Sequence, residues 1–429
     1  MKKIGVLLFV LILPAMLFAR GGQAADENYL RFAWWGNTTR DQRTVEVVRL
    51  FEQRNPGVTI ETEAVGWGGY FERMNTMAAA GSLPDVMQQD VSQIKGWSDR
   101  NLLEDLAPFA QRGGLLNLAN WDDAGLAPGR LNGKLVGLLL GTNALTMVVD
   151  PEILQQAGVT LDDTAWTWAN YETIATQIFR NTGIQTMPII INIRQTIEHI
   201  SRQLGAPLFT ADERQVGIAV NQEALNALRS FLEMQMRLVS AGVIWDPEDG
   251  AISSRAFEEF PFGRGRTWND VIWSNQYTTY ANIKGRPLRL VMFPSVAAPK
   301  APFGNYMRPS MFISMLSASG NKNLSARFIN FFSNDLDANR ILLAERGVPI
   351  PTDVRADLFE RVDAHNRVIF EFINRIGPFA SPSDAPPPVA GREVELAMQA
   401  TLLQLLTNRI NLDAAMNQLV QGSNAILQR

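Results

Sequence analysis

Short apolar runs and longer amphipathic stretches alternate through the first hundred residues of the chain. Apolar residues cluster at 30–35, the segment 84–88 contains the apolar pair Val86 and Met87, and apolar and polar residues alternate at 58–62. We interpret all three segments as β-strands. Between these runs, residues 38–54 and 70–80 carry apolar side chains at helical spacing and are followed by glycine-containing turns. Strands and helices that alternate with short connections predict a parallel sheet flanked by helices.

The same pattern returns in the rest of the chain. We expect strands in three apolar runs, at 138–149, 187–193 and 289–293. We expect helices in amphipathic stretches at 167–182, 222–241, 324–332, 394–405 and 412–420. A proline-rich interruption at 378–388 is most simply a surface loop. The sequence therefore predicts an α/β protein whose C-terminal end is helical.

The first 25 residues differ from the rest of the chain. Lys2 and Lys3 precede an apolar stretch at 4–19, and small residues follow it. This order is typical of a secretory signal peptide, and cleavage after Ala19 or Ala24 fits it. The apolar stretch is short for a membrane span, although an N-terminal membrane anchor is the alternative.

Composition narrows the chemistry that the chain can perform. The absence of cysteine excludes a disulfide scaffold, a thiolate metal site, a cysteine nucleophile and a lipid-anchored N-terminal cysteine. The only two histidines, His199 and His365, are far apart in sequence, which removes most histidine-based metal sites and general bases. Aromatic residues are abundant instead, with 10 Trp and 22 Phe, and this favours binding over catalysis.

Charge and the missing cysteine indicate partners and location. Loss of the signal peptide removes three basic residues and no acidic one, which leaves 36 basic and 43 acidic residues and a net charge of −7. A chain this acidic is a poor partner for nucleic acid or anionic membrane surfaces. Because no cysteine follows the apolar stretch, we expect a released protein without a lipid anchor. The periplasm is its expected location, with full secretion as the second possibility.

Short motifs occur along the chain in an informative order. They lie at 32–36, 78–86, 147–158, 262–265 and 313–332. In this order they resemble the extracellular solute-binding proteins of sugar-type ABC transporters, the family that includes maltose-binding protein. The chain departs from the family at Trp268 and Asn269, where Ala-Met is common, and at Asp150, where Asn is usual. These departures make it unsafe to transfer a ligand from relatives.

The resemblance implies a fold and a division of the chain. The fold is the two-lobe periplasmic binding protein fold (type II, Venus-flytrap), an α/β fold with mainly parallel sheets flanked by helices. The signal peptide is at 1–25, the N-terminal lobe comprises 26–140 plus 306–345, and the C-terminal lobe comprises 141–305 plus 346–429. Crossings at 139–146, 302–308 and 346–351 would form a hinge, and the ligand would lie between the lobes and stabilise their closure.

The resemblance also implies a function. The protein would be the substrate-binding protein of an ABC importer, capturing a mono- or oligosaccharide and delivering it to a membrane permease as a monomer without a cofactor. A non-sugar solute, such as a polyol phosphate or a peptide, is the first alternative. A secreted glycoside hydrolase with a carboxylate pair is the second, and no catalytic motif supports it. We therefore expect no enzyme activity.

A sugar site needs flat aromatic surfaces for ring C–H faces and polar side chains for hydroxyls. In open α/β sheets such groups lie beyond the carboxyl ends of strands. We therefore name as candidate ligand-binding residues Trp34, Trp35, Asn37, Trp67, Tyr70, Asp90, Asn143, Trp245, Trp273, Tyr306, Arg308 and Arg346.

The candidates also have structural interpretations. Trp34 and Trp35 are neighbours on a strand and point to opposite faces, so one of them belongs to the core, and the sequence does not tell which. Trp67 is flanked by glycines and is expected to be exposed in a loop. The alternatives for four others are a helix cap for Asp90, a turn for Asn143, core packing for Trp273 and a surface salt bridge for Arg346.

Overall fold

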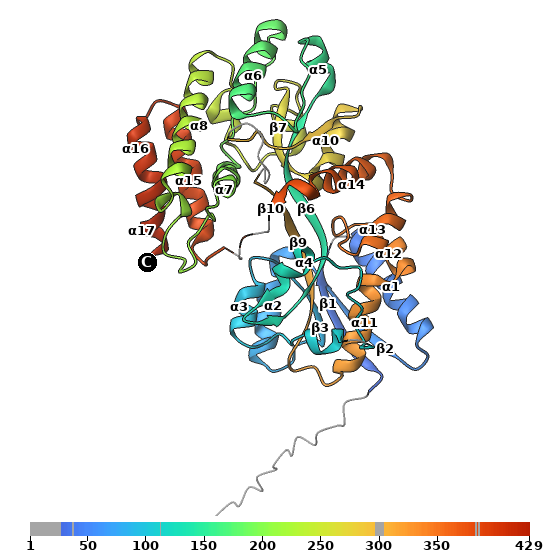
Figure 1. Cartoon of the computed structure of the whole chain (residues 1–429). Helices are drawn as coiled ribbons and strands as arrows, with labels where there is room; N and C mark the ends of the chain where they lie inside the picture. The colour runs from blue at the N-terminus through green and yellow to red at the C-terminus, as the bar shows by residue number, and fades with distance from the viewer. Residues whose placement is uncertain (1–26, 37, 112, 297–303, 382–383, 385–386) are drawn as a thin grey trace, which may run out of the picture.

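Two bodies of helices and strands, joined by a narrow crossing, form the protein in the computed structural model (Figure 1). The structure describes residues 27–36, 38–111, 113–296, 304–381, 384 and 387–429. The predicted signal peptide lies outside these ranges. Within them, no helix combines the length and the apolar character that a membrane crossing requires.

The lower lobe of Figure 1 is built first along the chain. It contains β1 (Tyr29–Trp35), α1 (Thr38–Arg54), β2 (Thr59–Val65), α2 (Trp67–Ala79), β3 (Val86–Gln89), α3 (Ile94–Asp99), α4 (Asp123–Leu126), β4 (Arg130–Leu131) and β5 (Lys134–Leu135). β1 pairs in parallel with both β2 and β3. The predicted alternation of strands and helices and its parallel sheet are confirmed for this part of the chain.

The upper lobe follows β6 (Leu138–Val149), which leaves the lower lobe. It contains α5 (Pro151–Gln156), α6 (Trp168–Thr182), α7 (Ile193–Gln203), α8 (Gln222–Ser240), α9 (Pro247–Gly250), β7 (Asn269–Trp273), α10 (Tyr277–Lys284) and β8 (Arg289–Val291). The chain returns through β9 (Asn305–Met315) to α11 (Lys322–Asn334), α12 (Leu336–Leu342) and α13 (Thr352–Phe359). It ends in the upper lobe with α14 (Ala364–Ile376), β10 (Ala380–Ser381), α15 (Gly391–Leu406), α16 (Leu412–Asn417) and α17 (Ser423–Leu427).

One sheet runs through both lobes. Its strand order is β2-β1-β3-β9-β6-β7, with β8 also paired to β6 and β10 to β9. The pairs β3–β9, β6–β9, β6–β7 and β6–β8 are antiparallel. The expectation of mainly parallel sheets therefore holds for β1 with β2 and β3 and for β10 with β9, and it is wrong for the other pairs. A chain that crosses to the second lobe and returns beside itself must run in both directions, and this makes the shared pairing antiparallel.

The crossing consists of β6 and β9 with a third segment beside them, which contains Val348 and connects α12 to α13. Ala144 pairs with Met307 toward the upper lobe, and Leu138 pairs with Ile313 toward the lower lobe. An irregularity in the register lies at Gly141. Next to it, Thr142 and Val348 exchange two backbone hydrogen bonds of 2.8 and 3.1 Å. The third segment is thereby fixed against β6.

Each lobe has its own hydrophobic core. In the lower lobe, the sheet buries side chains against α1 and α11 on one face and against α2 on the other. In the upper lobe, one cluster lies against α6 to α8 and α15, and a second lies against α10 and α14. The residue bounds predicted for the two lobes stay a prediction.

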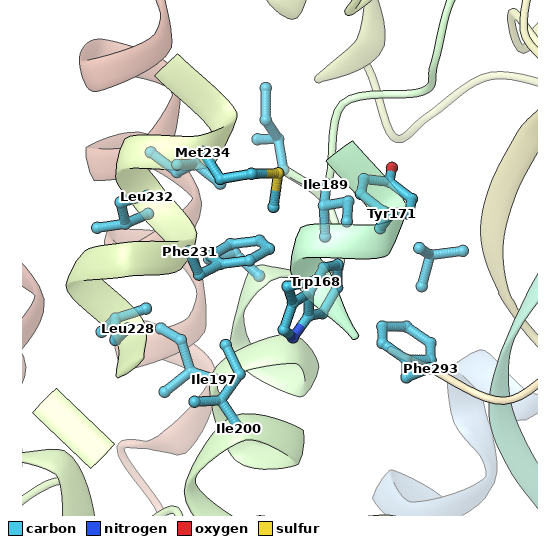
Figure 2. Close-up of a cluster of buried hydrophobic side chains, with 14 of the residues drawn as sticks. Trp168, Tyr171, Ile189, Ile197, Ile200, Leu228, Phe231, Leu232, Met234 and Phe293 are labelled. Carbon is cyan, nitrogen blue, oxygen red and sulfur yellow. The ribbon is translucent and has the colours of Figure 1, made fainter. Parts of the chain in front are cut away.

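The predicted strand at 187–193 is wrong. Only Gln185 and Thr186, just before it, form isolated bridges, and α7 already begins at Ile193. The apolar run is hydrophobic because it is buried: Figure 2 shows Ile189 among core side chains of α6 and α8 such as Tyr171. A short apolar run has the same appearance in a buried loop as in a strand.

A glycine substitution tests how closely the crossing is packed. Gly141→Ala is expected to lower the free energy of unfolding by about 1–3 kcal/mol, as overpacking does. The reason is that a Cβ at Gly141 would lie 2.5 Å from the backbone oxygen of Arg346. Urea denaturation measures the change.

The matched control is Gly96→Ala in α3, where nothing lies within 4 Å of the added Cβ. This change is expected to be neutral or to stabilise by up to about 1 kcal/mol. Equal effects of the two substitutions would contradict close packing at Gly141.

Candidate functional site

Both lobes direct the carboxyl ends of strands toward the crossing. In the lower lobe, Gln89 at the end of β3 pairs with Phe312, and the opposite end of β3 pairs with Met315, farther along β9 from the crossing. In the upper lobe, β7 runs antiparallel to β6, so that its last residue, Trp273, pairs with Leu145. Residues that follow these strand ends therefore lie where the two lobes meet.

Two of the predicted aromatic residues are fully buried. The Trp34 indole donates a hydrogen bond of 2.8 Å to Asp41 of α1. The Tyr70 hydroxyl donates to the backbone oxygens of Ala33 and Gln88, at 3.2 and 2.9 Å. Burial also raises the pKa of Tyr70 well above its ordinary value. These polar tips are satisfied inside the core, which corrects the expectation that Trp34 and Tyr70 contact a ligand.

Trp35 and Trp67 form an aromatic edge on the lower lobe. Trp35 is 6% exposed and packs edge-to-face against Trp67, with ring centroids 5.1 Å apart. Trp67 is 53% exposed. It is the first residue of α2 and not part of a loop, which corrects that detail of the prediction. Trp35, and not its neighbour Trp34, therefore lies beside an exposed aromatic ring.

Three further candidates on or near the lower lobe differ in what the structure says of them. Asp90 follows β3, and its Oδ1 accepts hydrogen bonds from the amide and hydroxyl of Ser92, at 2.8 and 2.6 Å. This turn leads into α3, whose N-cap residue is Gln93, so the alternative of a helix cap for Asp90 is wrong and its carboxylate holds a turn instead. Asn37 lies outside the described residues. Tyr306 is a residue of β9 that pairs with Ser381, and its side chain is outside the described part.

The upper lobe holds a cavity of about 480 Å³, which we call the Trp273 cavity. Its walls come from the start of α7, from β7, from α15 and from the crossing strand β9. Of the predicted residues, Trp273 and Arg308 line it. The Arg308 guanidinium lies over the Trp273 ring, 4.8 Å from its centre. These two candidates are thus brought together, although they are 35 positions apart in the sequence.

Polar groups in the Trp273 cavity are only partly satisfied. Gln195 Oε1 and Arg255 Nη1 are buried, and neither has a hydrogen-bond partner among the described residues. Asp270 Oδ2 accepts a hydrogen bond of 2.5 Å from Tyr280, and burial raises the pKa of Asp270 to about 6. Because buried polar groups are normally paired, these two groups each lack a hydrogen bond in this arrangement of the cavity wall.

A second cavity of about 440 Å³, the Arg346 cavity, lies between α1, α14 and the third crossing segment. Asn143 and Arg346 both line it. Arg346 is only 4% exposed, and it donates to Gln88 Oε1 at 2.9 Å and to Thr44 Oγ1 at 2.8 Å. Burial lowers its pKa to about 9. The alternative of a surface salt bridge for Arg346 is therefore wrong.

Trp245 does not line either cavity. Its indole donates a hydrogen bond of 2.6 Å to Asp249, which also forms ion pairs with Arg255 and with Arg264. The hydrogen bond from Arg255 is the main reason why the pKa of Asp249 falls to about 2. Trp245 therefore holds the carboxylate that orients Arg255, and it has no direct contact with the cavity.

Most of the polar lining of the Trp273 cavity was not predicted from the sequence. The lining residues that were not predicted include Arg194, Gln195, Arg255, Asp270, Arg392 and Glu395. They lie on two helices, a loop and a strand, at distant positions in the sequence. The only local signal is the spacing of Arg392 and Glu395, whose ion pair of 3.0 Å is an ordinary helix-surface feature.

No group of three or more His, Asp or Glu side chains that could hold a metal ion occurs within the described ranges. The site is thus defined by aromatic rings, amides, guanidinium groups and two carboxylates. Such groups bind a polar solute by hydrogen bonds and by contact with apolar C–H surfaces.

Comparisons with solved structures agree with this architecture. An extracellular solute-binding protein family 1 from Alicyclobacillus acidocaldarius superposes with a TM-score of 0.80 and 24% identity, over 94% of this chain and 98% of that one. A periplasmic oligogalacturonide binding protein from Yersinia enterocolitica gives a TM-score of 0.77 and 19% identity, over 94% and 99%. At these identities the likeness shows the two-lobe fold alone.

Sequence comparisons give the family. The arabinooligosaccharide-binding protein of Bacillus subtilis is 25% identical over 194 residues, which are 43% of this chain and 43% of that protein. The chain thus matches less than half of the length of its curated relatives. Residues 46–362, well over half of the chain, match the family described as bacterial extracellular solute-binding protein. The chain belongs to that family.

Proposed function

We propose that this protein is the substrate-binding protein of an ABC importer, which captures a mono- or oligosaccharide between its lobes and delivers it to a membrane permease. The observation that carries the proposal is the Trp273 cavity, which lies beside the strand crossing of a solute-binding protein. Its volume of about 480 Å³ lies in the range of roughly 300–1,000 Å³ that is typical of small-molecule sites.

The lining suits a sugar better than an apolar ligand. Trp273 supplies aromatic surface, and the side chains of Asn192, Gln195 and Arg308 line the same cavity. Trp67 lies on the lower lobe at the strand ends that point toward the crossing, and half of its surface is exposed. Closure of the lobes would bring a second aromatic ring toward the ligand, as expected for a hinged binding protein.

Relatives support the carbohydrate class. One solved neighbour is named an oligogalacturonide binding protein, and one curated relative is named an arabinooligosaccharide-binding protein. Both names concern oligosaccharides, and neither protein is more than 25% identical to this chain. They favour the sugar class without indicating a particular sugar.

The contacts of the cavity's two carboxylates favour binding over hydrolysis. A glycosidase needs one carboxylic acid to protonate the leaving oxygen and one free carboxylate as base or nucleophile. Asp270 accepts hydrogen bonds from Tyr280 and from the amide of Val271. Glu395 is held by Arg194 and Arg392. Both groups are engaged in structural contacts, so the glycoside hydrolase alternative has no support from this site.

The remaining parts of the proposal follow from family membership and from the sequence. Residues 1–25 act as a signal peptide, the mature protein diffuses freely in the periplasm as a monomer, and its closed form docks on a permease. The lobe bounds at 140, 305 and 345 belong to the same proposal.

Ligand binding should change both fluorescence and stability. At a sugar concentration 100 times the Kd, mass action is expected to raise the free energy of unfolding by about 2.7 kcal/mol. Closure over Trp273 and Trp67 should change tryptophan fluorescence at the same concentrations. A thermal-shift and fluorescence screen of neutral and acidic saccharides measures both. A chain that responds to no saccharide, and that cleaves a chromogenic glycoside, would overturn the proposal.

Trp273→Ala is expected to weaken sugar binding by about 10-fold or more, the scale for loss of a buried aromatic anchor. Isothermal titration calorimetry measures the Kd. Trp273→Phe keeps an aromatic surface and should lose less affinity. Wild-type affinity in the alanine variant would remove Trp273 from the site.

Trp67→Ala tests the lower lobe in the same way. Because the ring is half-exposed, its removal should cost more affinity than stability, with a Kd increase of about 3- to 10-fold. Val220→Ala is the matched control, since it shortens another exposed apolar side chain, one that does not line the cavity. If both variants bind sugar equally well, the ligand does not reach Trp67.

A further inference from the structure

The charges around the Trp273 cavity are unbalanced. Its lining includes four arginines and two carboxylates, namely Arg194, Arg255, Arg308, Arg392, Asp270 and Glu395. The mature chain is acidic as a whole, so this local excess of positive charge runs against its overall composition. An excess of guanidinium groups at a cavity attracts an anion.

One carboxylate serves two of the arginines. Glu395 lies 3.7 Å from Arg194 and 3.0 Å from Arg392, and it also accepts a hydrogen bond of 3.4 Å from Gln195. Arg194 has Glu198 as a second partner, at 3.5 Å. These two arginines are therefore neutralised within the protein and hold the α7–α15 wall together.

The other carboxylate is not an ion-pair partner. Asp270 is bound by the Tyr280 hydroxyl and by its neighbour's amide, and no described arginine or lysine lies within 4 Å of it. Its buried position disfavours the ionised form. It therefore does little to offset the positive charge of the cavity.

Two guanidinium groups remain with unused capacity. Within the described ranges, Arg308 has no carboxylate within 4 Å, and its guanidinium lies 4.8 Å from the centre of the Trp273 ring. Stacking on an aromatic ring orients a guanidinium and leaves its N–H groups at the edges. Arg255 is paired with Asp249 on one side, while its buried Nη1 has no hydrogen-bond partner in the described part of the chain.

These contacts also indicate the form of the anion. A hexuronate has its carboxylate attached directly to a pyranose ring, so that apolar C–H surface and negative charge are neighbours in one residue. The cavity has the same arrangement, because the aromatic Trp273 and the cationic Arg308 are in contact. A planar carboxylate also fits the planar fork of a guanidinium group with two parallel hydrogen bonds.

We propose that the Trp273 cavity is specific for an acidic sugar, and that Arg308 binds the carboxylate of a hexuronate residue. This inference rests on the proposed function and narrows it to one substrate class. Neutral sugars of the same size then lack the group that completes the site. A ligand without the negative charge cannot form the charge-assisted hydrogen bonds with Arg308 that complete the site.

Calorimetric titration of the full mature chain with two matched disaccharides tests the proposal. The acidic probe is digalacturonic acid, and the neutral probe is galactobiose, which has hydroxymethyl groups in place of the carboxylates. The acidic disaccharide is expected to bind at least about 10-fold more tightly, the scale of charge-assisted hydrogen bonds. Its affinity should fall as salt is raised from 0.05 to about 0.5 M, because added ions screen the attraction.

Arg308→Gln removes the charge and keeps a polar side chain. The ratio of acidic to neutral affinity is expected to fall at least about 10-fold toward one. Arg308→Lys keeps the charge without the fork and should retain part of the preference. Arg237→Gln is the matched control, because it removes an exposed arginine outside the cavity and should leave the ratio unchanged. Thermal unfolding of each variant checks that the fold is intact.

The outcomes separate this inference from the proposed function. Equal or tighter binding of the neutral disaccharide overturns the acidic-sugar inference and leaves sugar transport in place. Tight binding of glucose 6-phosphate or inorganic phosphate in preference to digalacturonic acid also overturns it, and assigns the arginines to a phosphate. A preference for digalacturonic acid that survives in Arg308→Gln overturns the role of Arg308. Binding of no saccharide at all overturns the proposed function itself.

Discussion

The antiparallel pairing of β6 with β9 is the interaction on which the rest of the molecule depends. These two strands belong to the sheet of both lobes, so the same ladder of hydrogen bonds orients one lobe against the other. The ladder also builds the site, because Arg308 is a residue of β9 and Trp273 pairs with Leu145 of β6. A shift of one residue in this register would turn Arg308 to the opposite face of the sheet and away from the tryptophan.

The fold was predictable where each local segment carries its own signal. The strands and helices of the lower lobe show clear periodicity, and their short connections leave few possible topologies. Prediction failed at 187–193, where burial by α6 and α8 gives a loop the hydrophobicity of a strand. It also failed on strand direction, because antiparallel pairing at the crossing joins segments about 170 positions apart. The hydrophobic periodicity of a segment does not indicate which distant segment it pairs with, or in which direction.

The site was predictable only in part, for a related reason. Sequence position correctly indicated that aromatic residues follow the strand ends. It did not distinguish an aromatic side chain that is buried in the core from one that is exposed. The Tyr70 hydroxyl is satisfied by two backbone oxygens that only the folded chain brings near it. Of the four cavity arginines only Arg308 was a sequence candidate, and Arg194, Arg255 and Arg392 were missed because each one looks like an ordinary surface residue in its own segment. Arg308 differs from the other three in having no carboxylate within 4 Å among the described residues, and this is a property of the assembled lobe.

Continuity of the sheet has a consequence for how tightly any ligand is held. The two lobes share the hydrogen-bonded pairing of β6 with β9. Any movement of one lobe relative to the other must therefore twist or bend these two strands, which resist the deformation. The measured affinity is then the intrinsic affinity of the closed form multiplied by the fraction of molecules that reach it. The register of β6 and β9 is irregular at Gly141, where the third segment closely approaches the backbone. Residues of the crossing can therefore change the apparent affinity of the proposed site without lining its cavity.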